Sequence, residues 1–96
     1  QLRALAPDLI ITQGLCDVCA VIDGEVHRLA EALAPPPRLL SLTATDLAGI
    51  WQDIRAVAAA IGCQAAAETL ITEHQARLVA LAERRTATQP RVVCIE

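Results

Sequence analysis

Two cysteines separated by two residues, Cys16 and Cys19, are the side chains of this sequence best suited to chemistry. Such a C-x-x-C pair can act as a redox dithiol, bind a metal with two further ligands, or shape a loop as thiols or a disulfide. A redox dithiol needs its first thiol at the start of a helix, where the helix dipole lowers the thiol pKa. Asp23 and Gly24 instead predict a helix start several residues later, which disfavours redox catalysis.

The remaining potential ligands and nucleophiles do not complete a site in the sequence. We predict that Cys63 lies within a helix and Cys94 within a strand, both as small structural side chains. His27 and His74 fall at spacings that do not complete a zinc site. His74 shares an apolar helical stripe with Leu70, which predicts a core residue with a hydrogen-bond partner, and His27 is predicted to be solvated. The sequence therefore predicts no bound metal.

Composition and motifs narrow the function further. The sequence contains no Ser-His-Asp set, phosphate-binding loop or dinucleotide fingerprint, so we do not expect an enzyme. The net charge is −3, and the eight basic residues are dispersed arginines, so we do not expect nucleic acid as a partner. No run of 18 apolar residues predicts a membrane span, and the first residues do not resemble a signal peptide.

Strand-like and helix-like patterns alternate along the chain. Leu9–Thr12 and Arg38–Leu42 are short apolar runs typical of strands in a parallel sheet, and residues 92–95 predict a third strand. Helical periodicity covers residues 24–34, a stretch capped by Thr45 or Asp46 that ends before Gly62, and residues 64–85. The alternation predicts an α/β fold with right-handed crossovers.

The connection between the second and third predicted strands sets the domain organisation. Its helical part spans roughly forty residues, more than a simple crossover needs, which predicts a long helix bridging two lobes. On this interpretation, residues 1–62 are part of a parallel-sheet, Rossmann-like N-terminal lobe. Residues 63–88 form an interdomain backbone helix, and residues 89–96 form the first strand of a C-terminal lobe. We therefore expect the chain to be part of a larger protein.

Segments along nearly the whole chain also match one known pattern in order. They are the helix-to-strand junction Ala6–Gln13, the C-x-V-C-A-V loop Cys16–Val21, the strand end and helix start Leu42–Ile50, the D-I-R helix Asp53–Gly62, and the strand Arg91–Glu96. This ordered set resembles the class III substrate-binding proteins of ABC importers, and the cysteine loop is similar to that of the cobalamin-binding members.

The resemblance implies a two-lobed protein that holds its ligand between the lobes with little hinge motion. Proteins of this class deliver cobalamin, ferric siderophores or haem to a membrane permease, and they are periplasmic or anchored outside the membrane. An aromatic residue often found after the first strand is replaced here by Gln13. One wall of the cleft would be formed by Gln13, Gly14, Cys16, Asp17, Val18 and Cys19, and Glu96 would lie at the opening of the other lobe.

The resemblance also implies docking to the permease through an acidic residue on each lobe, paired with arginines. Asp23 or Glu25 is the candidate in this chain. An acid at the start of a helix has a simpler explanation, because the helix dipole stabilises it whatever else it does.

We conclude from the sequence that the chain belongs to a non-catalytic binding module for cobalamin or a related metal chelate, with no cofactor besides that ligand. A thiol-dependent redox or metal-binding domain centred on Cys16 and Cys19 is the alternative. A third possibility is an α/β piece without a ligand of its own. The open sheet edge and the unpartnered third strand also predict a tendency to dimerise or swap strands.

Overall fold

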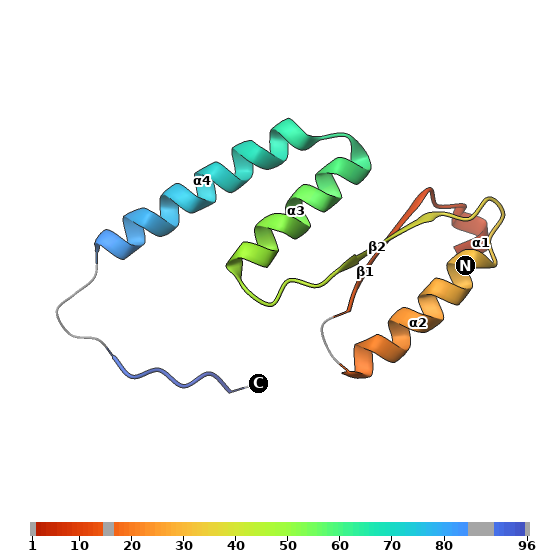
Figure 1. The fold of residues 1–96 in the computed structure, drawn as a ribbon, viewed down its shortest axis with the longest axis horizontal. Coiled ribbons are helices and arrows are strands. Elements are labelled where there is room, and N and C mark those ends of the chain that lie inside the picture. Colours follow the sequence, from red (N-terminus) through yellow and green to blue (C-terminus); the bar gives the residue numbers. More distant parts are fainter. Residues whose placement is uncertain (1, 15–16, 85–89, 96) are drawn as a thin grey trace.

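The computed structural model describes residues 2–14, 17–84 and 90–95. In chain order its elements are α1 (Leu2–Leu5), β1 (Leu9–Gln13), α2 (Asp17–Glu31), β2 (Arg38–Leu42), α3 (Leu47–Ile61) and α4 (Gln64–Glu83). Figure 1 shows the two strands between α2 on one side and the α3–α4 pair on the other. The described part of the chain is therefore an α/β structure, as the sequence predicts.

The two strands form a parallel pair in which Leu9 lies opposite Arg38 and Gln13 opposite Leu42. The β-branched residues of β1 and the leucines of β2 suit a pleated sheet with helices on its faces. The predicted bounds of β2 are confirmed, and β1 is one residue longer than predicted. Because a parallel pair needs a crossover, α2 must carry the chain from the carboxyl end of β1 back to the start of β2.

Helix α2 departs from the prediction, because residues 13–22 were expected to form a loop and Asp23 to cap the helix. The helix begins at Asp17, and Gly24 lies in its interior. Residues 17–22 contain no proline or glycine to interrupt a helix, so the Asp-Gly signal at 23–24 was misleading. The helix ends at Glu31, three residues before the expected end, because Pro35 disfavours helical geometry in the residue that precedes it.

Helices α3 and α4 form a pair whose ends follow the sequence signals closely. Asp46 caps α3, and its Oδ1 accepts the Gly49 N–H at 2.7 Å. Gly62 ends α3 with φ 76° and ψ 28°, a left-handed conformation that favours glycine. Helix α4 then begins at Gln64, with Cys63 at its N-cap position. Cys63 was predicted within a helix, so its place between the two helices is a correction.

An exposed ion pair joins α3 to α4. The Arg55 guanidinium donates two hydrogen bonds to the Glu68 carboxylate, from Nε to Oε1 at 2.6 Å and from Nη2 to Oε2 at 3.0 Å. The hydrogen bond from Arg55 lowers the pKa of Glu68, and the hydrogen bond to Glu68 raises the pKa of Arg55. Both side chains are about half exposed, so solvent screens the pair and it fixes geometry more than it adds stability.

The predicted third strand is not formed in the described residues. Pro90–Ile95 has no regular secondary structure, and β1 and β2 make up the sheet of the described part. A strand is defined by its backbone partner, and no further described strand is present to pair with this segment. Cys94 is accordingly exposed rather than packed as a small structural side chain, which corrects that prediction.

The described residues bury few side chains. The buried apolar residues among them are Ala30, Ala58, Ala67 and Ile71. The radius of gyration is 18.1 Å, whereas a compact chain of this length has about 12.5 Å. The accessible surface of 7924 Å² likewise exceeds the about 5,300 Å² typical of a compact protein of this mass. This open arrangement leaves large apolar side chains exposed, among them Leu5, Ile61 and Leu81.

Candidate ligand-binding edge

The carboxyl ends of β1 and β2 meet at one edge of the sheet. The strands are parallel and in register, so Gln13 and Leu42 end side by side. The Gly14 N–H donates to the Leu42 carbonyl oxygen at 3.0 Å, which extends the ladder one residue past β1. Ligands of open α/β sheets bind beyond this edge, where loops and helix starts converge. We define the carboxyl edge as residues 13–14, the first turn of α2 and the loop 43–46.

The residues predicted to form the cleft wall are partly gathered at this edge. Gln13 is exposed at the end of β1, and Gly14 is half-buried beside it. Asp17, Val18 and Cys19 belong to the first turn of α2 instead of a loop. The first backbone N–H groups of a helix lack intrahelical acceptors, so this correction places helix amides, rather than loop amides, at the edge. Cys16 and Glu96 lie outside the described residues.

The two candidate docking acids lie farther along α2 than predicted. Asp23 and Glu25 are the seventh and ninth residues of the helix that begins at Asp17. The dipole effect falls off within the first turn, so it does not account for acids at these positions. Glu25 is exposed. Stabilisation by the helix dipole, the simpler explanation that the sequence suggested for these acids, therefore does not apply.

The two histidines and Cys63 lie outside the carboxyl edge, on α2, on α4 and at the turn between α3 and α4. His74 is exposed on α4, so its prediction as a core residue is wrong. Its Nδ1 nevertheless lies 2.9 Å from the Leu70 carbonyl oxygen, and its ring centroid is 6.3 Å from that of Trp51. His27 is exposed, as predicted, and Cys63 is half-buried.

The loop between β2 and α3 is a further part of the edge, which the sequence predicts as a strand end and helix start but not as a ligand-binding segment. Its Ala44 N–H donates to Asp53 Oδ2 at 3.0 Å, so a side chain from the second turn of α3 binds the loop backbone. Asp53 lies seven residues after the N-cap Asp46, and this spacing of two turns places both on the same side of the helix. That spacing is the signal in the sequence that could have predicted a contact between Asp53 and the loop before α3. A small pocket of about 290 Å³ lies against this loop.

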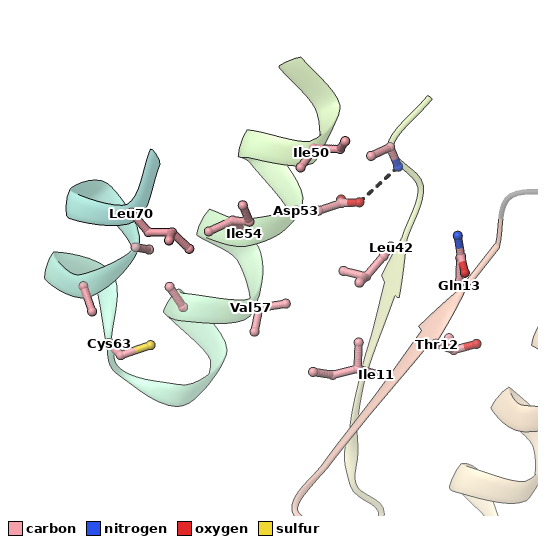
Figure 2. A pocket seen from close by; sticks show the side chains of 14 residues that line it. Ile11, Thr12, Gln13, Leu42, Ile50, Asp53, Ile54, Val57, Cys63 and Leu70 are labelled. Atoms are coloured by element: carbon pink, nitrogen blue, oxygen red, sulfur yellow. Dashed lines mark hydrogen bonds between the residues drawn. The ribbon is translucent and has the colours of Figure 1, made fainter. Parts of the chain in front are cut away.

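A larger groove of about 800 Å³ runs from the edge between the sheet and the two C-terminal helices. Figure 2 shows Ile11 and Leu42 pointing from the strands toward α3, with Val57 pointing back toward them. The lining is apolar apart from Thr12, Gln13, Cys63 and Asp53, and Asp53 is the one charged residue among the described lining residues. The groove can therefore accept apolar surface but offers no cation to an anionic ligand.

Metal and membrane features are not found in the described part of the molecule. No three of its histidine, cysteine, aspartate and glutamate side chains gather as metal ligands do. None of its helices is long and apolar enough to cross a membrane. Comparison with protein-family models, with curated proteins and with solved structures finds no match to this chain. The function must therefore be argued from the carboxyl edge itself.

Proposed function

We propose that the chain is part of the substrate-binding component of an ABC importer, which holds cobalamin or a related large metal chelate between two lobes. The observation that carries this proposal is the ordered carboxyl edge of the parallel β1–β2 pair. There the Gly14 backbone, which the hydrogen bond to Leu42 fixes, the start of α2 and a hydrogen-bonded loop form one wall. A large ligand is held by such a wall of backbone groups and short side chains, without need of catalytic residues.

The open shape of the chain supports a second lobe. Helix α4 has 20 residues, which corresponds to about 30 Å of length, and most of its residues are exposed. Leu78 and Leu81 continue its apolar stripe and remain exposed. A long helix with an uncovered apolar stripe suits a connector between a Rossmann-like N-terminal lobe and a C-terminal lobe that begins with residues 89–96.

The charges at the edge favour one cargo over the others. Asp46 and Asp53 both line the small pocket beside the loop, and no described residue lining it or the larger groove is cationic. Haem carries two propionates and many ferric siderophores are anionic, so carboxylates at the wall oppose both. Cobalamin carries neutral amides around its corrin ring, and the cobalt centre balances the charge of its single phosphodiester, so it suits this wall better. We therefore propose cobalamin as the first cargo to test.

A titration tests this proposal directly. The full-length protein that contains this chain is titrated with cobalamin, haem and a ferric siderophore. Binding is followed by calorimetry and by tryptophan fluorescence, to which Trp51, the single tryptophan of the chain, contributes. We expect saturable binding of cobalamin at micromolar affinity or tighter. Binding of haem or the siderophore alone would transfer the proposal to that cargo, and binding of none would refute it.

The thiol-dependent redox or metal-binding function remains the second candidate, and the start of α2 favours it. Because the helix begins at Asp17, Cys16 directly precedes the first helical residue in sequence, which removes the objection that the helix starts too late. A thiol-reactivity titration of Cys16 decides this alternative. A Cys16 thiol pKa of about 8.5, the ordinary value for cysteine, argues against this alternative. A strongly acidic thiol, together with full ligand affinity in Cys16→Ser, favours it.

The proposed importer function also sets the partner and the location. The protein would act in the periplasm, or anchored on the outer side of the membrane, and would deliver its ligand to an ABC permease. Asp23 and Glu25 on α2 are the residues proposed to contact that permease. Exposure of Glu25 supports this role, since a docking side chain must reach the partner.

A further inference from the structure

Asp53 is a carboxylate at the margin of an apolar groove, where a charge is costly unless it is hydrogen-bonded. It is half-buried on α3, and its neighbours along the groove include Ile50 and Ile54. The apolar stripe of α3 does not require an acid at this position. A specific contact must therefore compensate for its partial burial.

That contact is made with the loop that follows β2. Asp53 Oδ2 accepts the Ala44 N–H at 3.0 Å, drawn as the dashed line in Figure 2. A hydrogen bond to a carboxylate is stronger than one between neutral groups. It satisfies a backbone donor that belongs neither to the β1–β2 ladder nor to α3.

A second contact holds the same loop against the first turn of α3. A Cβ atom on Gly49 would lie 3.0 Å from the Ala44 Cα and 3.2 Å from its Cβ, so Ala44 packs directly on the helix backbone. Asp46 closes the loop by accepting the Gly49 N–H at 2.7 Å. The loop 43–46 is thus fixed to α3 by a side-chain hydrogen bond, a close backbone approach and a helix cap.

We infer that Asp53 is a positioning residue, which holds the loop 43–46 at the carboxyl edge in the shape that the ligand meets. Its effect on the ligand rests on the proposed function. A wall that is already ordered avoids the entropic cost of ordering it when the ligand binds. Asp53 therefore contributes to affinity through Ala44 and the loop, without touching the ligand itself.

The first test compares Asp53→Ala with Asp53→Asn by amide hydrogen exchange and by cobalamin titration. In Asp53→Ala we expect the Ala44 amide to exchange at least roughly tenfold faster, because the charged acceptor is lost. Cobalamin affinity should fall roughly tenfold. Asp53→Asn keeps a side-chain oxygen and should stay within about threefold of the unmodified protein on both readouts. Glu73→Ala, which removes an exposed carboxylate on α4, is the matched control and should change neither.

The second variant, Gly49→Ala, leaves Asp53 in place and disturbs the same loop. Its Cβ must displace Ala44, so both readouts should move as in Asp53→Ala. Protection of the α3 amides, such as that of Val57, should be retained in all variants, because a merely structural defect would raise exchange along the whole helix.

The outcomes separate this inference from the proposed function. Unchanged Ala44 exchange in Asp53→Ala refutes the positioning role, and so does faster exchange with unchanged cobalamin affinity. If the unmodified protein binds none of the three chelates, the proposed function fails. Localised loss of Ala44 protection in Asp53→Ala would still support the hold of Asp53 on the loop.

Discussion

Gly62 has a backbone conformation that other residues adopt at a cost, with φ 76° at the turn between α3 and α4. A Cβ at this position would meet no heavy atom within 4 Å, so a substitution tests the backbone alone. We expect Gly62→Ala to lower the free energy of unfolding by about 1 kcal/mol, the usual cost of a left-handed non-glycine residue. Urea unfolding followed by circular dichroism measures the change.

Gly24 is the matched control for this substitution. It lies in the interior of α2 and also has no heavy atom within 4 Å of an added Cβ, but its φ is not positive. Gly24→Ala should therefore stabilise the protein by up to about 1 kcal/mol, because alanine is the better helix former. If the free energy of unfolding changed in the same direction in both variants, the left-handed conformation of Gly62 would be contradicted.

The pairing of α3 with α4 depends on pH through the Arg55–Glu68 ion pair. The pKa of Glu68 is lowered in the folded protein, because its carboxylate accepts hydrogen bonds from Arg55. The contribution of the pair is therefore fully present above the ordinary glutamate pKa of about 4.3 and is lost as the pH falls through the lowered folded value. An NMR titration of the Glu68 carboxyl should show a midpoint below the ordinary value.

The same titration in Arg55→Ala provides the comparison. The midpoint of Glu68 should return toward the ordinary value when its partner is removed, and high salt should shift it in the same direction. Arg77→Ala on α4 is the control for a general change in charge. A Glu68 midpoint that is insensitive to Arg55 would show that the ion pair does not persist in solution.

Helix α2 carries the test of permease docking. Replacing both acids by lysine, Asp23→Lys with Glu25→Lys, should reduce transport through the importer, because the permease arginines would face like charge. Ligand affinity should be unchanged, since both acids lie beyond the first turn of α2. Glu83→Lys on α4 is the control for a change in charge. Transport at the original rate in the double variant would refute the docking role.

At the scale of elements, the sequence predicted what local signals determine. The first two predicted strands, the Gly62 stop and a cap at Asp46, one of the two candidates, follow from side-chain pattern and backbone preference, and these predictions are confirmed. The predicted start of α2 was wrong because Asp23-Gly24 imitates a helix cap, whereas residues 17–22 contain no proline or glycine and continue the helix from Asp17. A strand over residues 92–95 could not be settled locally, because pairing depends on a partner elsewhere in the structure.

The candidate site was predictable only in part for a similar reason. Gln13 and Gly14 could be placed because ligand sites follow the carboxyl ends of parallel strands. The role of Asp53 depends on how the loop 43–46 folds back on α3, which a single sequence does not display. The exposure of His74 shows the same limit, since its ring lies beside Trp51 of α3 and yet stays exposed, which the apolar pattern of α4 alone does not reveal.

At the scale of the whole molecule, apolar surface remains open on the sheet and at the C-terminal segment. Val92, Val93 and Ile95 are 76%, 82% and 93% exposed, and each strand of the two-stranded sheet has an edge without a described strand beside it. Exposed β-branched segments add readily to such edges. In the proposed two-lobed protein, this segment pairs within the second lobe instead.

The 96-residue chain by itself should therefore associate with further copies through the segment 91–95. Sedimentation velocity over a concentration series should show this association, and Val93→Pro should abolish it, because proline removes a backbone donor from the added strand. Val79→Lys, which removes an exposed apolar side chain from α4 without altering the segment, should associate like the unmodified chain. If Val93→Pro associates unchanged while Val79→Lys becomes monomeric, the contact runs through the apolar surface of α4, and strand addition is rejected. A protein that includes the second lobe should remain monomeric, since its own sheet occupies the strand.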